Sequence, residues 1–401
     1  MSGGNSIGDG PLIYVMAGEA SGDVLGARLM QALSAARPGV RFEGVGGVRM
    51  AELGLHSLFP LSDLAVMGII EPLFRLRRLK RRYNEALADI ALKQPAIVVT
   101  IDSPGFMHWV LEALAKRGVP RVHYVAPQVW AWREHRVKKY PGLWDKLLCL
   151  LPFEPAWFAA RGVEGVFTGH PVLQSGAGQG DGDRFRATHG LTPDQPVLIL
   201  MPGSRRSEAP RLLPVFGRTL ERLALREPAL RPVLPVSAVV ADLVRRATAS
   251  WPVQPIIVTE LSDKHDAYAA ARQHGAALTK SGTSTLELAL AGVPMAVTYR
   301  VNPLSAAMAR RMIKVPHVAM VNLLAGRQVV PELLQQDCTP EILSRTTLTL
   351  LRDPAIADAQ REAFGAVIAS LRPPQGTPSE AAAREVLAVL DFAKPPQHQN
   401  P

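Results

Sequence analysis

The chain has 401 residues, of which 47% are apolar and 20% charged, a balance typical of globular proteins that excludes wholesale disorder. The net charge of +10 favours an anionic partner such as nucleic acid, phospholipid or a phosphorylated substrate, while the aromatic content of only 6% disfavours stacking on RNA bases. The two cysteines, Cys149 and Cys338, are too far apart in sequence for a disulfide framework or a cysteine-metal cluster, which indicates a reducing cytoplasm.

Residues 1–10 lack the basic and apolar parts of a signal peptide, so we expect a disordered leader there and a disordered tail at 394–401. No stretch reaches the ~18 uncharged apolar residues that a membrane-spanning helix needs.

Short apolar runs alternate with longer amphipathic segments along the chain. This alternation predicts strands at 12–17, 96–101, 121–125, 196–201, 231–236, 255–258, 276–278 and 295–299, with an early helix at 24–36. Alternating strands and helices are typical of parallel sheets wrapped by helices. At roughly 150 residues per domain, the length suggests two to three domains.

One segment interrupts the alternation. Residues 174–183 are rich in glycine and nearly devoid of apolar side chains, which favours a domain boundary. The fold class predicted is α/β, with two Rossmann-like doubly wound parallel-sheet domains facing a cleft. The expected parts are a leader at 1–10, an N-terminal domain at 11–172, a linker at 173–190, a C-terminal domain at 191–375, a C-terminal helix at 376–393 that could pack back on the first domain, and the tail at 394–401.

Three motifs in the first half follow strands or turns. Gly18, Glu19 and Ser21 lie after the first strand, where small residues allow close approach of a ligand, although turn and packing glycines would give the same pattern. Asp102 ends a later strand and could act as a general base or as a turn-forming residue. The stretch 124–133 is consistent with either a sugar-stacking wall or a core aromatic pair, with its aromatic and basic residues at Trp130, Trp132 and Arg133.

The segment 66–82 combines apolar and basic residues. Six of the eight residues in 75–82 are basic, and the apolar positions fall near helical spacing, although Pro72 begins or kinks the helix. A basic amphipathic segment is typical of membrane-surface binding, but an ordinary helix packed on a core would look similar. The candidate membrane patch comprises Val66, Met67, Ile69, Ile70, Leu73, Phe74, Arg75, Arg77 and Arg78.

Two motifs in the second half indicate a nucleotide diphosphate site. Gly203, Ser204 and Arg205 follow a strand, and the arginine can clamp a phosphate where a helix begins. Residues 281–284 form a similar hydroxyl- and glycine-rich turn, and Glu287 follows early in the next helix, where it suits a ribose diol or simply complements the helix dipole. The UDP-binding residues predicted are Gly203, Ser204, Arg205, Ser281, Gly282, Thr283, Ser284 and Glu287.

These segments together resemble the lipid-A-disaccharide synthase family, in family order across most of the chain. The matching stretches are 17–23, 65–68, 124–133, 151–154, 169–171, 202–205 with 208, 282–283 with 287, 294–300 and 322–327. The resemblance implies the two-Rossmann-domain GT-B glycosyltransferase architecture. It also implies an inverting transferase that joins UDP-2,3-diacylglucosamine to 2,3-diacylglucosamine 1-phosphate (lipid X), giving the β-1,6-linked lipid A disaccharide 1-phosphate and UDP in lipopolysaccharide biosynthesis.

The resemblance also suggests roles and partners. Asp102 is the first choice as the base and Glu19 the second, and the acceptor or sugar contacts are assigned to Gly18, Ser21, Trp130, Trp132, Arg133 and Asn322. We expect no metal, no other cofactor and no nucleic acid, but peripheral attachment to the cytoplasmic face of the inner membrane of a Gram-negative bacterium. A homodimer is left open.

One departure from the family pattern stands beside Asp102. Gly105 and Met107 occupy the positions of a second acid and an asparagine, so no role of those residues transfers to this chain. Two alternatives are also weighed: another GT-B enzyme acting on UDP-N-acetylglucosamine, either a lipid-linked muramyl peptide transferase or a 2-epimerase, and a non-catalytic UDP-sugar-binding peripheral membrane protein.

Overall fold

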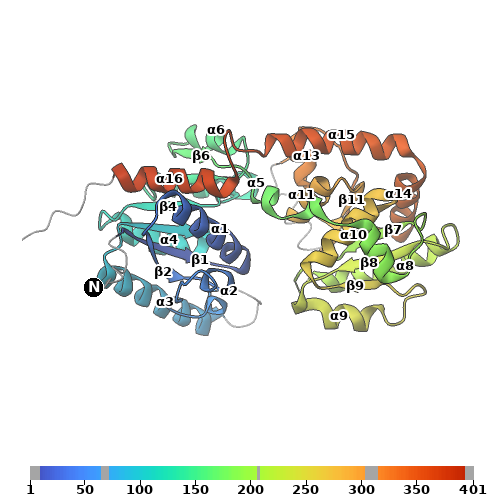
Figure 1. Cartoon of the computed structure of the whole chain (residues 1–401), viewed down its shortest axis with the longest axis horizontal. Helices are drawn as coiled ribbons and strands as arrows, with labels where there is room; N and C mark the ends of the chain where they lie inside the picture. The colour runs from blue at the N-terminus through green and yellow to red at the C-terminus, as the bar shows by residue number, and fades with distance from the viewer. Residues whose placement is uncertain (1–9, 65–71, 206–207, 303–314, 393–401) are drawn as a thin grey trace, which may run out of the picture. The chain divides into compact units, whose positions relative to one another are not determined.

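The computed structural model describes residues 10–64, 72–205, 208–302 and 315–392, and the side chains within these ranges except those of 72–75. The chain divides into two compact units (Figure 1). The first contains the residues up to Pro171 together with those from Leu371 onward, and the second contains Val172–Ser370. The chain therefore leaves the first unit once and returns to it near its C-terminus.

The first unit is built on a six-stranded parallel sheet with the order β2-β1-β3-β4-β5-β6. Its strands are β1 (Leu12–Ala17), β2 (Arg41–Val45), β3 (Ile97–Ile101), β4 (Arg121–Tyr124), β5 (Lys146–Cys149) and β6 (Gly165–Phe167). Side chains alternate between the faces of a strand, so Ile13 and Val15 join one core while Tyr14 and Met16 join the core on the other face. The core that contains Tyr14 and Met16 also contains side chains from α3 (Pro72–Lys93) and α4 (Pro104–Ala115).

The helices that complete this unit come from both ends of the chain. Helix α1 (Ala20–Ala36) packs against α16 (Pro378–Phe392), and Ala382, Ala383 and Val386 of α16 enter the core that α1 shares (Figure 1). The shorter helices are α2 (Val48–Ala51), α5 (Val129–Trp132), α6 (Glu154–Ala159) and the 3-10 turns η1 (Leu61–Asp63) and η2 (Glu134–Lys139). Helix α1 begins at Ala20, four residues before the start expected from the apolar pattern, because small residues carry no helical periodicity.

The second unit repeats the architecture with the strand order β12-β11-β10-β7-β8-β9. Its strands are β7 (Val197–Met201), β8 (Arg231–Pro235), β9 (Ile256–Val258), β10 (Gly275–Lys280), β11 (Met295–Tyr299) and β12 (Glu332–Leu334). Its main helices are α7 (Gly182–His189), α8 (Ala209–Ala224), α9 (Ala238–Thr248), α10 (Leu261–Gln273), α11 (Thr283–Ala291), α13 (Met320–Ala325), α14 (Pro340–Arg352) and α15 (Pro354–Ser370). The prediction of two doubly wound parallel sheets is confirmed.

The glycine-rich stretch expected as a linker is structured. Helix α7 lies within 173–190 and packs on α10, where the Arg184 guanidinium nitrogen Nε is 2.7 Å from a carboxylate oxygen of Asp266. A Cβ at Gly180 would lie 1.9 Å from the carbonyl oxygen of His265, so glycine at this position permits close packing of two backbones. The glycines of this stretch therefore allow its backbone to pack closely on α10 and α11.

Candidate functional site

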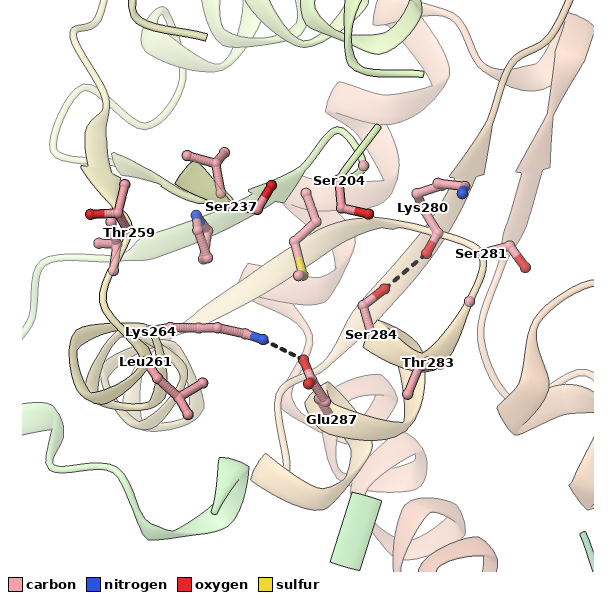
Figure 2. Close-up of a pocket in the computed structure, with 16 residues that line it drawn as sticks. Ser204, Ser237, Thr259, Leu261, Lys264, Lys280, Ser281, Thr283, Ser284 and Glu287 are labelled. Carbon is pink, nitrogen blue, oxygen red and sulfur yellow. Dashed lines mark hydrogen bonds and ion pairs between the residues drawn. The ribbon is translucent and has the colours of Figure 1, made fainter. Parts of the chain in front are cut away.

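In the second sheet, the direction in which successive strands are added reverses between the neighbouring strands β7 and β10. Strands β8 and β9 extend from β7 to one side, and β11 and β12 extend from β10 to the other. In open α/β sheets, ligands bind beyond the carboxyl ends of the strands at such a switch point. A pocket of about 430 Å³ lies there (Figure 2), lined by Met201, Gly203, Ser204, Pro235, Val236, Ser237, Val258, Thr259, Leu261, Lys264, Lys280, Ser281, Gly282, Thr283, Ser284 and Glu287.

Two glycines shape the turns that form one wall of this pocket. Gly203 after β7 has φ +110°, and Gly282 after β10 has φ +147°, both in a region that residues with a Cβ rarely adopt. Gly282 precedes Thr283, the first residue of α11, so the free backbone N–H groups of that helix terminus lie at the pocket. Such N–H groups and the positive end of a helix dipole suit a phosphate.

The hydroxyl groups of the β10–α11 turn are partly used to hold the turn itself. The Ser284 hydroxyl donates to the Lys280 carbonyl at 3.2 Å, and the Ser281 hydroxyl donates to the Val318 carbonyl at 2.7 Å. Figure 2 shows Thr283, Ser284 and Glu287 on the first turns of α11. The serines therefore fix the path of the backbone, which presents its own N–H groups to a ligand.

Two lysines line the pocket beside the residues that the sequence indicated. Lys280 Nζ lies 2.8 Å from Glu208 Oε1, and Arg205 Nη1 lies 3.4 Å from the same oxygen. Lys264 Nζ lies 2.7 Å from Glu287 Oε2. Lys280 directly precedes the Ser281–Ser284 motif and could have been included with it. Lys264 lies on α10, and no local sequence signal marks it.

In the first sheet, the direction in which successive strands are added reverses between the neighbouring strands β1 and β3. Gly18 directly follows β1, and Asp102 directly follows β3. A Cβ at Gly18 would lie 2.0 Å from the Cβ of Ser103, so the two strand ends approach closely only because residue 18 is glycine. Glu19 and Ser21 are exposed at the start of α1. The structure therefore brings the Gly18 turn and the Asp102 turn together.

The backbone beside Asp102 is strained. Asp102 has φ +54°, Ser103 has φ +50°, and Val125 after the neighbouring strand has φ +80°. Left-handed conformations are unfavourable for residues with a Cβ, most of all for β-branched ones, and they concentrate at functional sites. Burial raises the pKa of the Asp102 carboxyl, while a hydrogen bond from the Ser103 N–H at 2.7 Å partly offsets that effect.

The residues of the aromatic motif lie in different environments. Trp130 is buried and donates through Nε1 to Glu154 Oε1 at 3.1 Å. Trp132 is 43% exposed, and the Arg133 guanidinium carbon lies 3.9 Å from its ring centroid. Of the three candidate side chains in this motif, Trp132 is exposed, Arg133 is half-buried against its ring, and Trp130 is buried.

Asn322 is fully buried in the second unit. Its Nδ2 donates to the Val330 carbonyl and to Glu332, and its Oδ1 accepts from the N–H groups of Val329 and Val330. All of its amide groups therefore hold the segment after α13 in place.

The candidate membrane patch is described only in part. Val66, Met67, Ile69 and Ile70 lie outside the described residues, as do the side chains of Leu73, Phe74 and Arg75. On α3, Arg77 is exposed, and Arg78 is exposed and lies 3.7 Å from Asp63. The opposite face of this helix packs into the core through Ala86, Leu87 and Ile90.

Among the described residues, no three His, Cys, Asp or Glu side chains gather as a metal site would require. Within the same ranges, no helix combines the length and the apolar character needed to cross a bilayer.

Comparisons with known proteins agree with the sequence resemblance. A family model described as lipid-A-disaccharide synthetase matches residues 13–386. A lipid-A-disaccharide synthase of Gluconobacter oxydans is 62% identical, with 95% of this chain and 91% of the relative covered. One of Granulibacter bethesdensis is 58% identical, with 95% and 99% covered.

Solved structures share the fold at low sequence identity. The calicheamicin glycosyltransferase CalG4 has a TM-score of 0.61 and 17% identity, with 96% of this chain and 100% of that chain covered. MurG of Acinetobacter baumannii has a TM-score of 0.56 and 15% identity, with 94% and 99% covered. A structure of MnaA from S. aureus with UDP has a TM-score of 0.61 and 14% identity, with 94% and 95% covered.

Proposed function

Because this chain belongs to the family of lipid-A-disaccharide synthases, glycosyltransferases of lipid A biosynthesis, we propose how its residues divide the work of that reaction. The reaction proposed joins UDP-2,3-diacylglucosamine to 2,3-diacylglucosamine 1-phosphate. The 6-hydroxyl oxygen of the acceptor attacks C1 of the donor, the bond from C1 to the diphosphate breaks, the hydroxyl proton passes to a base, and UDP leaves.

The pocket of the second unit is assigned to the UDP part of the donor, and its geometry is the observation that carries this assignment. The turns at Gly203 and Gly282 suit the diphosphate because their backbones can approach it closely and α11 begins there. Pro235, Val236, Val258 and Leu261 provide apolar surface for the uracil ring at the other strand ends. The structure of MnaA with UDP supports this assignment as a fold-level analogy.

We assign the stabilisation of the negative charge that develops on the leaving diphosphate to cations and N–H groups of the protein. Arg205 and Lys280 share the Glu208 carboxylate, and the N-terminus of α11 lies at the same pocket. Cations and N–H dipoles fixed before the reaction stabilise developing charge without reorganising. This assignment requires no metal ion, and activity in the presence of excess chelator is its direct test.

The acceptor is assigned to the carboxyl edge of the first sheet, with Asp102 as the base. Its carboxyl group is largely buried, and burial raises its pKa toward the range useful to a general base. The strained backbone at Asp102 and Ser103 supports a functional role, because such strain needs a compensating reason to persist. Glu19 is the second candidate, since it lies exposed at the neighbouring strand end.

We assign attachment to the cytoplasmic face of the inner membrane to the segment 66–82. Leu76 is 51% exposed on α3, and Arg77 and Lys80 are exposed beside it. Each basic residue near an anionic leaflet contributes about 1 kcal/mol to binding. Both substrates carry acyl chains, so reversible adsorption would let the enzyme draw them from the bilayer and return its product.

A single assay tests the whole reaction. UDP release is measured with both diacylated sugars in mixed micelles, and then with either one omitted. Release that requires both sugars, together with a disaccharide phosphate product, supports the proposal. A further reaction contains UDP-N-acetylglucosamine as the only sugar substrate. Release of UDP in that reaction would instead favour an epimerase-like or hydrolytic activity.

A further inference from the structure

The carboxylate of Glu287 is not free to bind a ribose through both of its oxygens. Its Oε2 accepts from Lys264 Nζ at 2.7 Å and lies 3.4 Å from the Tyr268 hydroxyl. No described residue donates to its Oε1. With Oε2 engaged, Oε1 remains to accept from one ribose hydroxyl, and a second polar group beside it can contact the other hydroxyl.

Lys264 is placed to be that partner. It lines the same pocket as Glu287, its side chain is 22% exposed, and Figure 2 shows it extending across the pocket from α10 toward α11. An ammonium group has three N–H donors, and only one of them is used on Glu287. The ammonium also lies 5.6 Å from the centroid of the Tyr268 ring, which helps to hold it in position.

The separation of Thr283 and Glu287 along α11 is suited to the separation of the diphosphate and the ribose in a nucleotide. Glu287 follows Thr283 by four residues, so both lie on one face of the helix and about 6 Å apart along its axis. With the diphosphate at the helix terminus, the adjoining ribose lies beside Glu287 and Lys264. The buried Tyr268 contacts both side chains, with its hydroxyl 3.4 Å from Glu287 Oε2 and its ring centroid 5.6 Å from Lys264 Nζ.

We propose that the ribose diol of the donor is recognised by the Lys264–Glu287 ion pair acting together, with Glu287 Oε1 accepting from one hydroxyl and Lys264 Nζ donating to the oxygen of the other. This inference rests on the proposed UDP site and adds Lys264 as a specificity-determining residue. An analogue that lacks one hydroxyl loses one of these two hydrogen bonds to a charged group, so the site discriminates against it.

The test is a set of calorimetric titrations of the full chain with UDP, 2′-deoxy-UDP and 3′-deoxy-UDP. The wild type should bind UDP about tenfold or more tightly than the deoxy analogues, the scale of a lost hydrogen bond to a charged group. Lys264→Met should reduce the preference to within about threefold for the analogue that lacks the hydroxyl contacted by Lys264, and should keep the preference against the other analogue. Lys280→Met, the matched control in the same pocket, should weaken binding of all three nucleotides and keep the preference.

The outcomes separate the inference from the proposed function. A wild type that binds no UDP would refute the UDP site itself. A wild type that binds UDP but shows no preference for the full diol, or a Lys264→Met protein that keeps the wild-type preference, would overturn the role of Lys264 alone. If Lys264→Met fails to fold, Lys264→Ala replaces it, with the same selective loss expected and retention of the preference against both analogues counting against the proposal.

Discussion

Lys280 and Glu208 are separated by 72 residues in sequence, yet their side chains lie 2.8 Å apart beside the turns of the second sheet. Glu208 also contacts Arg205, so one carboxylate holds two cations at the candidate phosphate site. The other oxygen of Glu208, Oε2, is buried and has no hydrogen-bond partner within the described ranges. This arrangement positions both cations before a ligand arrives.

Removing one of these cations should weaken UDP binding selectively. Arg205→Ala is expected to lower the affinity for UDP by about 1.5–3 kcal/mol, the scale of a charge-assisted contact, and to leave uridine affinity nearly unchanged. Isothermal calorimetry measures both. Arg222→Ala, at an exposed position of the neighbouring helix α8, is the control. Equal UDP affinities in the wild type and Arg205→Ala would contradict the phosphate assignment.

Asp102→Asn should abolish the base while preserving the shape of the turn. We expect turnover to fall by about 10²–10⁴, with UDP affinity unchanged. In the wild type, turnover should rise with pH through the raised pKa of Asp102, because only the carboxylate accepts a proton. A variant that keeps a third of the activity would move the base to Glu19 or elsewhere.

The same pKa shift predicts the effect of Asp102 on stability. A folded-state pKa above the unfolded value means that the fold prefers the neutral carboxyl group, so this residue lowers stability as the pH rises above the unfolded value. Asp102→Asn should therefore melt at or above the wild-type temperature at pH 7. A clear drop in melting temperature would show that the charged group supports the fold.

The contact between Gly18 and Ser103 can be tested with a pair of variants. Gly18→Ala places a methyl carbon 2.0 Å from Ser103 Cβ and should destabilise the first unit by about 1–3 kcal/mol. Ser103→Gly removes that Cβ and also relieves a left-handed backbone strain of about 1–2 kcal/mol. The double variant should therefore recover most of the melting temperature lost in Gly18→Ala. If the double variant instead shows no recovery of melting temperature, the loss in Gly18→Ala does not come from its contact with Ser103.

Two buried histidines predict acid sensitivity of the first unit. Burial lowers the pKa of His123 to about 3 and that of His170 to about 4. The unfolded chain therefore binds more protons below pH 6.5, and stability falls as the pH drops through that window, by about 2 kcal/mol for each histidine at pH 5.

Urea unfolding between pH 7 and pH 5 measures this loss. Replacing His123 and His170 with glutamine should flatten the pH dependence, whereas the same change at the exposed His56 should not. An unchanged slope in the double variant would show that other groups cause the acid sensitivity.

The basic face of α3 predicts salt-sensitive binding to membranes. Reversing the charge at Arg77 and Lys80 should reduce co-sedimentation with anionic vesicles by at least tenfold, at about 1 kcal/mol for each cation removed. The melting temperature should stay constant, because both side chains are exposed. Reversing Arg245 and Arg246 on α9 is the matched control. Equal losses in both variants would indicate an effect of net charge alone.

The sequence by itself determined the α/β class, the two-sheet organisation and the strand-end turns at Gly18, Asp102, Gly203 and Gly282. These features are local, because a strand followed by a glycine-containing turn and a helix is encoded within about twenty residues. The ordered set of motifs also indicated the family, which the comparisons confirmed.

Only the tertiary structure decided which side chains meet. Lys280 at the end of β10 reaches Glu208 after β7, because parallel strands bring their carboxyl ends to one edge of the sheet regardless of separation along the chain. Lys264 reaches Glu287 because α10 and α11 pack against each other. Trp130 is buried beside Glu154 although it is only two positions from the exposed Trp132. Burial depends on which elements pack above a residue, and that information is spread over the whole chain rather than carried by a motif.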